Sequence, residues 1–164
     1  EFSDFARMPK PLIKENNLYE IINENIILLS KIDSNIKIKL INHLPNNFLV
    51  NFDYEQFNRL FFNLIKNSIE SIQEKAEKDN KIDKNIDIEI RERRDYIIIN
   101  ILDTGIGFKD KKTKDLIKPY FTTKQKGTGL GLSIVDKIIS DHNGSINFLN
   151  QNNGAKIQII IPNK

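Results

Sequence analysis

Apolar residues recur along the chain at two kinds of spacing, and each kind predicts a different secondary structure. A repeat of three and four residues predicts amphipathic helices over about 18–31, 54–75 and 130–142. Alternating or continuous apolar runs predict strands over 36–41, 48–52, 85–92, 96–103, 145–150 and 155–162. The order of these elements predicts an α/β fold, a two-layer sandwich in which a mixed sheet carries its helices on one face.

Residue types at the ends of the helices support these boundaries. Asp53 is a good N-cap for the helix over 54–75, because its carboxylate can accept a hydrogen bond from an N–H group that the first turn leaves unpaired. Asn143-Gly144 is typical of a left-handed cap and is expected to end the helix over 130–142. No regular pattern persists between 104 and 127, so this segment is expected to be irregular.

The first residues suggest a piece of a longer protein. Residues 1–8 are helix-like and carry no initiator Met at the start, so they are interpreted as the tail of an upstream helix. Pro9-Lys10-Pro11 cannot continue that helix, since proline lacks an N–H donor and clashes with the preceding turn. Residues 9–17 are therefore expected to form a linker.

Composition limits the class of protein. The 164 residues are 39% hydrophobic and 29% charged, which suits one domain with a single packed core. The 25 basic and 22 acidic residues give a net charge of +3 and are spread along the chain, so no nucleic-acid partner is expected. The absence of Cys excludes disulfides, thiolate metal sites and cysteine nucleophiles, and it fits a reducing cytosol. No apolar stretch reaches the roughly 20 residues that span a bilayer.

Two asparagines interrupt the helix predicted over 54–75. Asn63 and Asn67 lie one turn apart, within a narrow arc at the edge of its apolar face. Asn is a poor helix former, so this placement sacrifices helix propensity. One interpretation is compositional bias, because Asn is common throughout the chain. The other is a cleft in which neutral amide oxygens hold a hard cation without adding negative charge beside phosphates.

A second candidate lies at the end of the strand predicted over 96–103. There Asp103-Thr104-Gly105-Ile106-Gly107 places a carboxylate beside two glycines. A turn capped by Asp would explain this pattern without any function. The functional interpretation is that the carboxylate accepts a hydrogen bond from an exocyclic amine, while the glycines let the backbone approach a flat ring.

A third candidate opens the last predicted helix. In Lys126-Gly127-Thr128-Gly129-Leu130-Gly131-Leu132, three glycines alternate into the first turn, where Gly is less favourable than Ala. Free N–H groups and the helix dipole make such an N-terminus an anion site suited to phosphates. A flexible hinge is the structural alternative, although a hinge requires no particular place relative to a helix.

Together the three segments resemble, in order and spacing, the nucleotide-binding domain of sensor histidine kinases in the GHKL superfamily. Residues 63–71 resemble the N box, 103–107 the G1 box, 119–124 the F box and 127–132 the G2 box, and Gly154-Ala155 is similar to the final glycine box. The first residues and the Phe-Thr-Thr-Lys sequence are similar to nitrogen-regulation kinases of the NtrY type. The resemblance implies a Bergerat-type fold with a mostly antiparallel sheet. It assigns residues 1–12 to the end of a dimerisation helix and its linker, and 13–164 to the catalytic ATP-binding domain.

The resemblance also implies roles for individual residues. Asp103 would accept the adenine amino group, and Gly105 and Gly107 would form the floor of the adenine pocket. Asn67 would bind the Mg²⁺ that bridges the ATP phosphates, with Asn63 one turn away supporting it. Residues 108–126 would form a lid over ATP, with Phe121 as its apolar anchor. The residues near the phosphates would be Lys124, Gly127, Thr128, Gly129, Leu130, Gly131 and Leu132.

The activity that the resemblance implies is donation of the ATP γ-phosphoryl group to a histidine on a dimerisation domain, for relay to a response regulator. Neither His43 nor His142 has the sequence context of that acceptor, which is expected to lie outside this chain. The whole protein is expected to be a homodimer anchored in the bacterial inner membrane. This domain is expected to lie in the cytoplasm and to be monomeric by itself.

Two other functions stay open. An ATP-hydrolysing machine is disfavoured, because the hydrolysing relatives carry a general-base Glu where this chain has Asn63, an amide without useful basicity. A nucleotide-sensing module that has lost phosphoryl transfer is disfavoured by the intact boxes. Transfer itself requires the dimerisation helices, most of which are expected to lie outside this chain.

Overall fold

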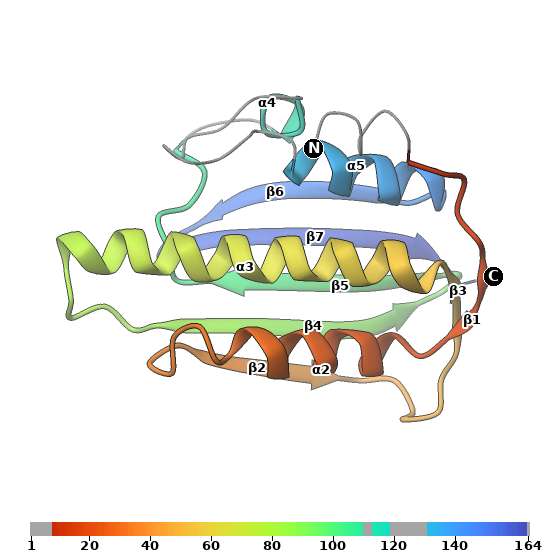
Figure 1. Cartoon of the computed structure of the whole chain (residues 1–164), viewed down its shortest axis with the longest axis horizontal. Helices are drawn as coiled ribbons and strands as arrows, with labels where there is room; N and C mark the ends of the chain where they lie inside the picture. Colours follow the sequence, from red (N-terminus) through yellow and green to blue (C-terminus); the bar gives the residue numbers. More distant parts are fainter. Residues whose placement is uncertain (1–7, 110–112, 119–130, 164) are drawn as a thin grey trace.

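The chain folds into two layers (Figure 1). The computed structural model describes residues 8–109, 113–118 and 131–163. In this part of the chain, the long helices α2 (Leu18–Leu29), α3 (Tyr54–Lys78) and α5 (Gly131–Asp141) lie side by side over one face of a five-stranded sheet. A single turn of helix, α4 (Thr113–Leu116), falls within the segment that the sequence predicts to be irregular.

The sheet is mixed. Its strands are β2 (Lys37–Asn42), β4 (Asn85–Arg93), β5 (Tyr96–Asp103), β6 (Ser145–Gln151) and β7 (Gly154–Pro162), in the order β2-β4-β5-β7-β6. β2 runs parallel to β4, and the other neighbouring pairs are antiparallel. The predicted α/β two-layer sandwich, with a mixed and mostly antiparallel sheet and helices on one face, is therefore confirmed.

The prediction that residues 9–17 form only a linker is wrong for residues 14–16. Within it, β1 (Lys14–Asn16) pairs antiparallel with β3 (Val50–Phe52) in a separate two-stranded sheet. The Asn16 side chain strengthens this pairing by donating from Nδ2 to the Phe52 carbonyl at 2.9 Å. The Lys-Glu-Asn sequence of β1 has no apolar alternation, so this strand depends on its partner and not on local propensity.

The core lies between α3 and the middle of the sheet. Its fully buried residues include Phe57, Leu60, Phe61 and Leu64 of α3 and Ile97, Ile99 and Ile101 of β5. The Phe57 ring stacks on Phe52, with the two centroids 4.5 Å apart, and meets Phe61 edge-on at 6.0 Å. Because side chains alternate along a strand, Asp103 faces the same side of β5 as these isoleucines.

Helix α5 ends as its sequence predicts. Asn143 adopts a left-handed φ of 60°, and the Gly144 N–H donates to the Ile139 carbonyl at 2.9 Å. The Asn143 N–H donates to the Ser140 carbonyl at 3.0 Å, which completes a Schellman cap. Gly144 is required for space, because a Cβ there would lie 2.5 Å from the Ile160 carbonyl oxygen.

A buried hydrogen-bond junction joins the start of α3 to the end of α5. Asp53 caps α3, as predicted, by accepting from the Gln56 N–H at 3.0 Å. The Asp53 N–H donates to His142 Nε2 at 3.0 Å, and His142 Nδ1 donates to the Ile138 carbonyl at 2.7 Å. An amide N–H can only donate, so these contacts fix the tautomer of His142 with its proton on Nδ1. The second Asp53 oxygen accepts from the Leu12 N–H at 2.7 Å, which fastens the incoming chain to the junction.

Replacing His142 by Phe is expected to lower the free energy of unfolding by about 1–3 kcal/mol, the usual cost of a buried donor left unpaired. The Asp53 N–H would lose its acceptor, whereas a ring would still pack against Phe57, whose centroid lies 4.6 Å from that of His142. His43→Phe is the matched control, because the His43 side chain is 53% exposed and contacts Glu89 at the surface. Urea unfolding measures both variants, and we expect the control to change by less than about 0.5 kcal/mol. Equal losses would contradict the role of the junction.

Candidate functional site

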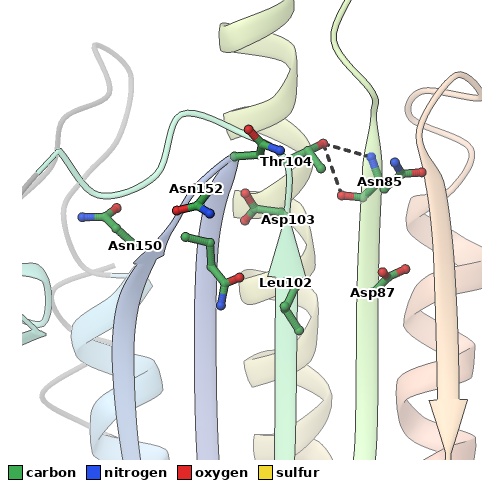
Figure 2. A pocket seen from close by; sticks show the side chains of 9 residues that line it. Asn85, Asp87, Leu102, Asp103, Thr104, Asn150 and Asn152 are labelled. Carbon is green, nitrogen blue, oxygen red and sulfur yellow. Dashed lines mark hydrogen bonds between the residues drawn. The ribbon is translucent and has the colours of Figure 1, made fainter.

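Asp103 stands at the end of β5 and turns its carboxylate toward the helices. The side chain is buried, and one of its oxygens accepts from the Gly105 N–H at 2.9 Å. Burial raises the pKa of Asp103, while hydrogen bonding to backbone at Gly105 and Ala155 and the positive charge of Lys75 oppose that rise. Figure 2 shows Asp103 near Thr104 and Asn152 at the strand ends. A cavity of about 470 Å³ at these strand ends is also lined by Asp87 and Leu102, whose side chains alternate with Asp103 and face away from the helices.

The Ser68 hydroxyl of α3 lies next to this carboxylate. Ser68 is buried, and its Oγ makes no hydrogen bond of standard geometry with the residues that the structure describes. Its proximity still favours the ionised form of Asp103 and lowers the pKa of that carboxyl. A buried carboxylate beside an unsatisfied hydroxyl is suited to a ligand that brings an N–H donor and a ring nitrogen.

The loop after β5 needs both of its glycines. A Cβ at Gly105 would lie 2.1 Å from Ser71 Oγ, and that oxygen accepts from the Ile106 N–H at 2.9 Å. Gly107 has a φ of +75°, and a Cβ there would lie 2.7 Å from Asn150 Oδ1. The loop is thus pressed against α3 at one glycine and against the end of β6 at the other.

The two predicted amides lie along α3, toward the start of α5. Asn63 and Asn67 are both half-buried, and Asn63 Nδ2 donates to the Arg59 carbonyl at 3.0 Å. A Cβ at Gly131, the first residue of α5, would lie 3.9 Å from Asn63 Oδ1. The structure therefore brings Asn63 and Gly131 together, while Leu132 packs against the core. Ser68, which lies next to Asp103, follows Asn67 in the sequence of α3, so the amides and the Asp103 site share one helix.

This geometry agrees with the comparison to known families. A model of the family described as "Histidine kinase-, DNA gyrase B-, and HSP90-like ATPase" matches residues 52–164. The chain belongs to this family. The matched region begins just before α3 and contains the amide-bearing helix, the loop after β5 and α5. Histidine-kinase ATPase-like domains use ATP, and the predicted superfamily is confirmed.

Individual relatives of the chain are sensor kinases. Nitrogen regulation protein NtrY of Azorhizobium caulinodans is 32% identical over 163 residues, which cover 98% of this chain and 21% of that protein. The nucleotide-free catalytic domain of histidine kinase ThkA has a TM-score of 0.77 at 29% identity, covering 92% of this chain and 95% of that one. ThkA in complex with response regulator protein TrrA matches with a TM-score of 0.81 at 23% identity over 99% of this chain and 45% of that chain, which shows the fold alone. The chain thus spans about a fifth of the length of NtrY, 21%.

Several predicted site residues lie outside the described residues. These are Phe121, Lys124, Gly127, Thr128, Gly129 and Leu130. Within the described residues, no group of three or more His, Asp or Glu side chains is placed to hold a metal ion. The same part of the chain contains no helix that is both long and apolar enough to cross a membrane.

Sequence reasoning missed the polar residues that support the site: Ser68, Ser71, Lys75 and Asn150. The two serines had a detectable signal, because they interrupt the apolar stripe of an amphipathic helix. Lys75 and Asn150 had none, since a lysine near a helix end and an asparagine in an Asn-rich turn are ordinary surface residues. Their importance depends on contacts with segments distant in sequence.

Replacing Asp103 by Asn is expected to raise the free energy of unfolding of the nucleotide-free domain at neutral pH by about 0.5–2 kcal/mol. The folded state raises the pKa of this carboxyl, so its contribution to stability is present below the ordinary pKa of Asp and is lost as pH rises through the folded-state pKa. An amide avoids this loss and can donate to Ser68 Oγ. Urea unfolding between about pH 4 and pH 8 should show an advantage of Asn that grows with pH. A constant difference would contradict the raised pKa.

Proposed function

We propose that this domain binds Mg²⁺-ATP and donates the γ-phosphoryl group to a histidine of a dimerisation domain. The observation that carries the proposal is the buried Asp103 carboxylate beside Ser68, whose Oγ makes no hydrogen bond of standard geometry with the described residues, on the same helix as Asn63 and Asn67. Membership of an ATPase-like family supports the nucleotide, and the kinase relatives support the reaction.

The base of the nucleotide is assigned to the Asp103 end. An ionised carboxylate accepts the hydrogen bond that the exocyclic amine of adenine donates, and Ser68 Oγ can serve a ring nitrogen directly or through water. Guanine carries a carbonyl oxygen where adenine carries this amine, so its lone pairs would face the carboxylate. The site is therefore expected to prefer ATP to GTP. Gly105 and Gly107 would bring the loop backbone close to the ring.

The phosphates are assigned to the other end, between α3 and the start of α5. Asn67 would hold Mg²⁺ through its side-chain oxygen, and the ion would neutralise charge on the phosphates. Asn63 lies beside Gly131, where unpaired N–H groups of the first helical turn favour anions. Lys124, Gly127, Thr128, Gly129, Leu130 and Leu132 are proposed to complete this end, and Phe121 to anchor the lid.

Hydrolysis of ATP is not the proposed outcome. Asn63 stands where a hydrolysing relative would need a base, and its Nδ2 already donates to a backbone carbonyl. An amide takes no proton from water, whereas general-base help is typically worth about 10²–10⁴ in rate. The domain would hold ATP until the acceptor nitrogen attacks the γ-phosphorus and ADP leaves.

The acceptor is proposed to come from the protein's own dimerisation domain. His142 is unsuited, because it is buried and both ring nitrogens are engaged at the α3–α5 junction. We further propose a response regulator as the next phosphoryl acceptor, in line with the ThkA–TrrA complex. The whole protein would be a homodimer at the inner membrane, with this domain in the cytoplasm.

Radiolabelled ATP tests the reaction. The domain alone is expected to bind ATP, to show no autophosphorylation and to release phosphate barely above background. Adding a separate dimerisation-helix fragment that carries the acceptor should label that histidine slowly, because the two pieces are not tethered. Gels run at neutral pH preserve the acid-labile phosphohistidine.

The same assay distinguishes the rival functions. Rapid release of phosphate by the domain alone would support an ATPase. Binding without labelling of the acceptor fragment would support a nucleotide-sensing module. Absence of ATP binding would contradict all three functions.

Asn67→Ala is expected to abolish the increase in ATP affinity that Mg²⁺ produces, while adenosine binding is kept. The substitution removes the proposed metal ligand at the phosphate end and leaves the Asp103 end intact.

Asp103→Asn should give the opposite pattern. Binding of ATP and of adenosine should both weaken about ten- to a hundredfold, because a charge-assisted hydrogen bond is lost. Calorimetric titrations with and without Mg²⁺ measure both variants. If Mg²⁺ still raised the ATP affinity of Asn67→Ala as it does in the wild type, Asn67 would not be a metal ligand.

A further inference from the structure

Lys75, near the end of α3, contacts the two segments that surround Asp103. Its Nζ donates to the Thr104 carbonyl at 3.2 Å and to the Asn153 carbonyl at 3.1 Å. Thr104 opens the loop after β5, and Asn153 lies in the turn between β6 and β7. One half-buried ammonium group therefore bridges a helix, a loop and a hairpin turn.

The bridged segments touch the backbone of Asp103 itself. A Cβ at Gly154 would lie 1.9 Å from the Asp103 carbonyl oxygen and 2.9 Å from Thr104 Cα, so the hairpin turn is packed directly on the strand end. At the far end of the loop, Asn150 Oδ1 accepts from the Phe108 N–H at 2.7 Å. The loop is thus held to the hairpin at both ends, by Lys75 at one and by Asn150 at the other.

The positive charge of Lys75 supports Asp103 in addition to the two carbonyl contacts. Asp103 is buried, and the nearby ammonium group stabilises its ionised form. A neutral side chain of the same length would keep the packing of the stem on α3. It would lose both carbonyl contacts and the charge.

We propose that Lys75 is a positioning residue for the base of the bound nucleotide, through its bridge between the Thr104 and Asn153 carbonyls. By holding the loop and the hairpin turn in place, it sets the position of the Asp103 carboxylate relative to the exocyclic amine. The inference rests on the proposed ATP function and adds a residue that selects adenine without touching it. Loss of the bridge therefore reduces discrimination between bases more than it reduces binding of the phosphates.

Lys75→Met tests this role, with Lys78→Met as the matched control. Lys78 lies on the same helix and is exposed. Calorimetry with non-hydrolysable analogues of ATP and GTP, in Mg²⁺, measures the ratio of the two affinities. We expect Lys75→Met to lose about tenfold in affinity for the ATP analogue and much less for the GTP analogue, so that the ratio falls. Lys75→Arg should restore the ratio, since it keeps the charge and the donors, and Lys78→Met should leave it unchanged.

Each outcome decides the matter. An unchanged ratio in Lys75→Met, or an equal loss for both analogues, would overturn the positioning role. Lys75→Gln, with a shorter neutral donor, takes the place of Met if that variant does not fold, and the ratio is again expected to fall. Binding by the wild type with no effect of Lys75 contradicts this inference alone. Failure of the wild type to bind either analogue contradicts the proposed function as well.

Discussion

The burial of one face of α3 against the sheet is the interaction on which the rest of the structure depends. Complete burial of each large apolar side chain of this helix contributes about 1.5–3 kcal/mol, so the rotation and register of the helix are firmly set. Polar residues at the edge of that face are then carried to fixed positions. Asn63 reaches the start of α5, Ser68 reaches Asp103, and Lys75 reaches the hairpin turn. The candidate site thus takes polar side chains from several turns of one helix.

The residues around Asp103 contribute less to the stability of the nucleotide-free fold than the apolar core beneath them does. An ionised carboxylate is buried there with a raised pKa, and the buried Ser68 hydroxyl beside it makes no hydrogen bond of standard geometry with the described residues. Both features weaken the nucleotide-free fold, since buried polar groups are normally paired. A ligand that donates to the carboxylate and pairs with the hydroxyl would remove the two penalties together. Binding and local stability are therefore coupled at this site.

Local pattern was sufficient for the three long helices, for the five strands of the main sheet taken singly, and for the Asp53 and Asn143 caps, because each is encoded by spacing or by one residue's own geometry. It also placed Asp103 at a strand end and Asn63 on a helix edge. It did not show that the strand predicted over 48–52 lies outside the main sheet, paired with β1. It failed for β1, whose three polar residues are a strand only because β3 lies beside them. It failed for Lys75 and Asn150 for the same reason. Their partners lie on segments distant in sequence, and no local periodicity reports such contacts.

Contacts between residues distant in sequence also hold the segment through which the chain enters the domain. The predicted boundary between residues 12 and 13 stays a prediction, but the residues before it are attached to α3. The Pro9 carbonyl accepts from Gln56 Nε2 at 3.0 Å, and the Leu12 N–H donates to Asp53 at 2.7 Å. Asp53 is in turn bonded to His142, at the end of the helix that Gly131 opens. A shift of this incoming segment must therefore break these partly buried hydrogen bonds or move with the start of α3. The attachment therefore connects the incoming segment, through Asp53 and His142, to the two helices that the proposed phosphate end would use.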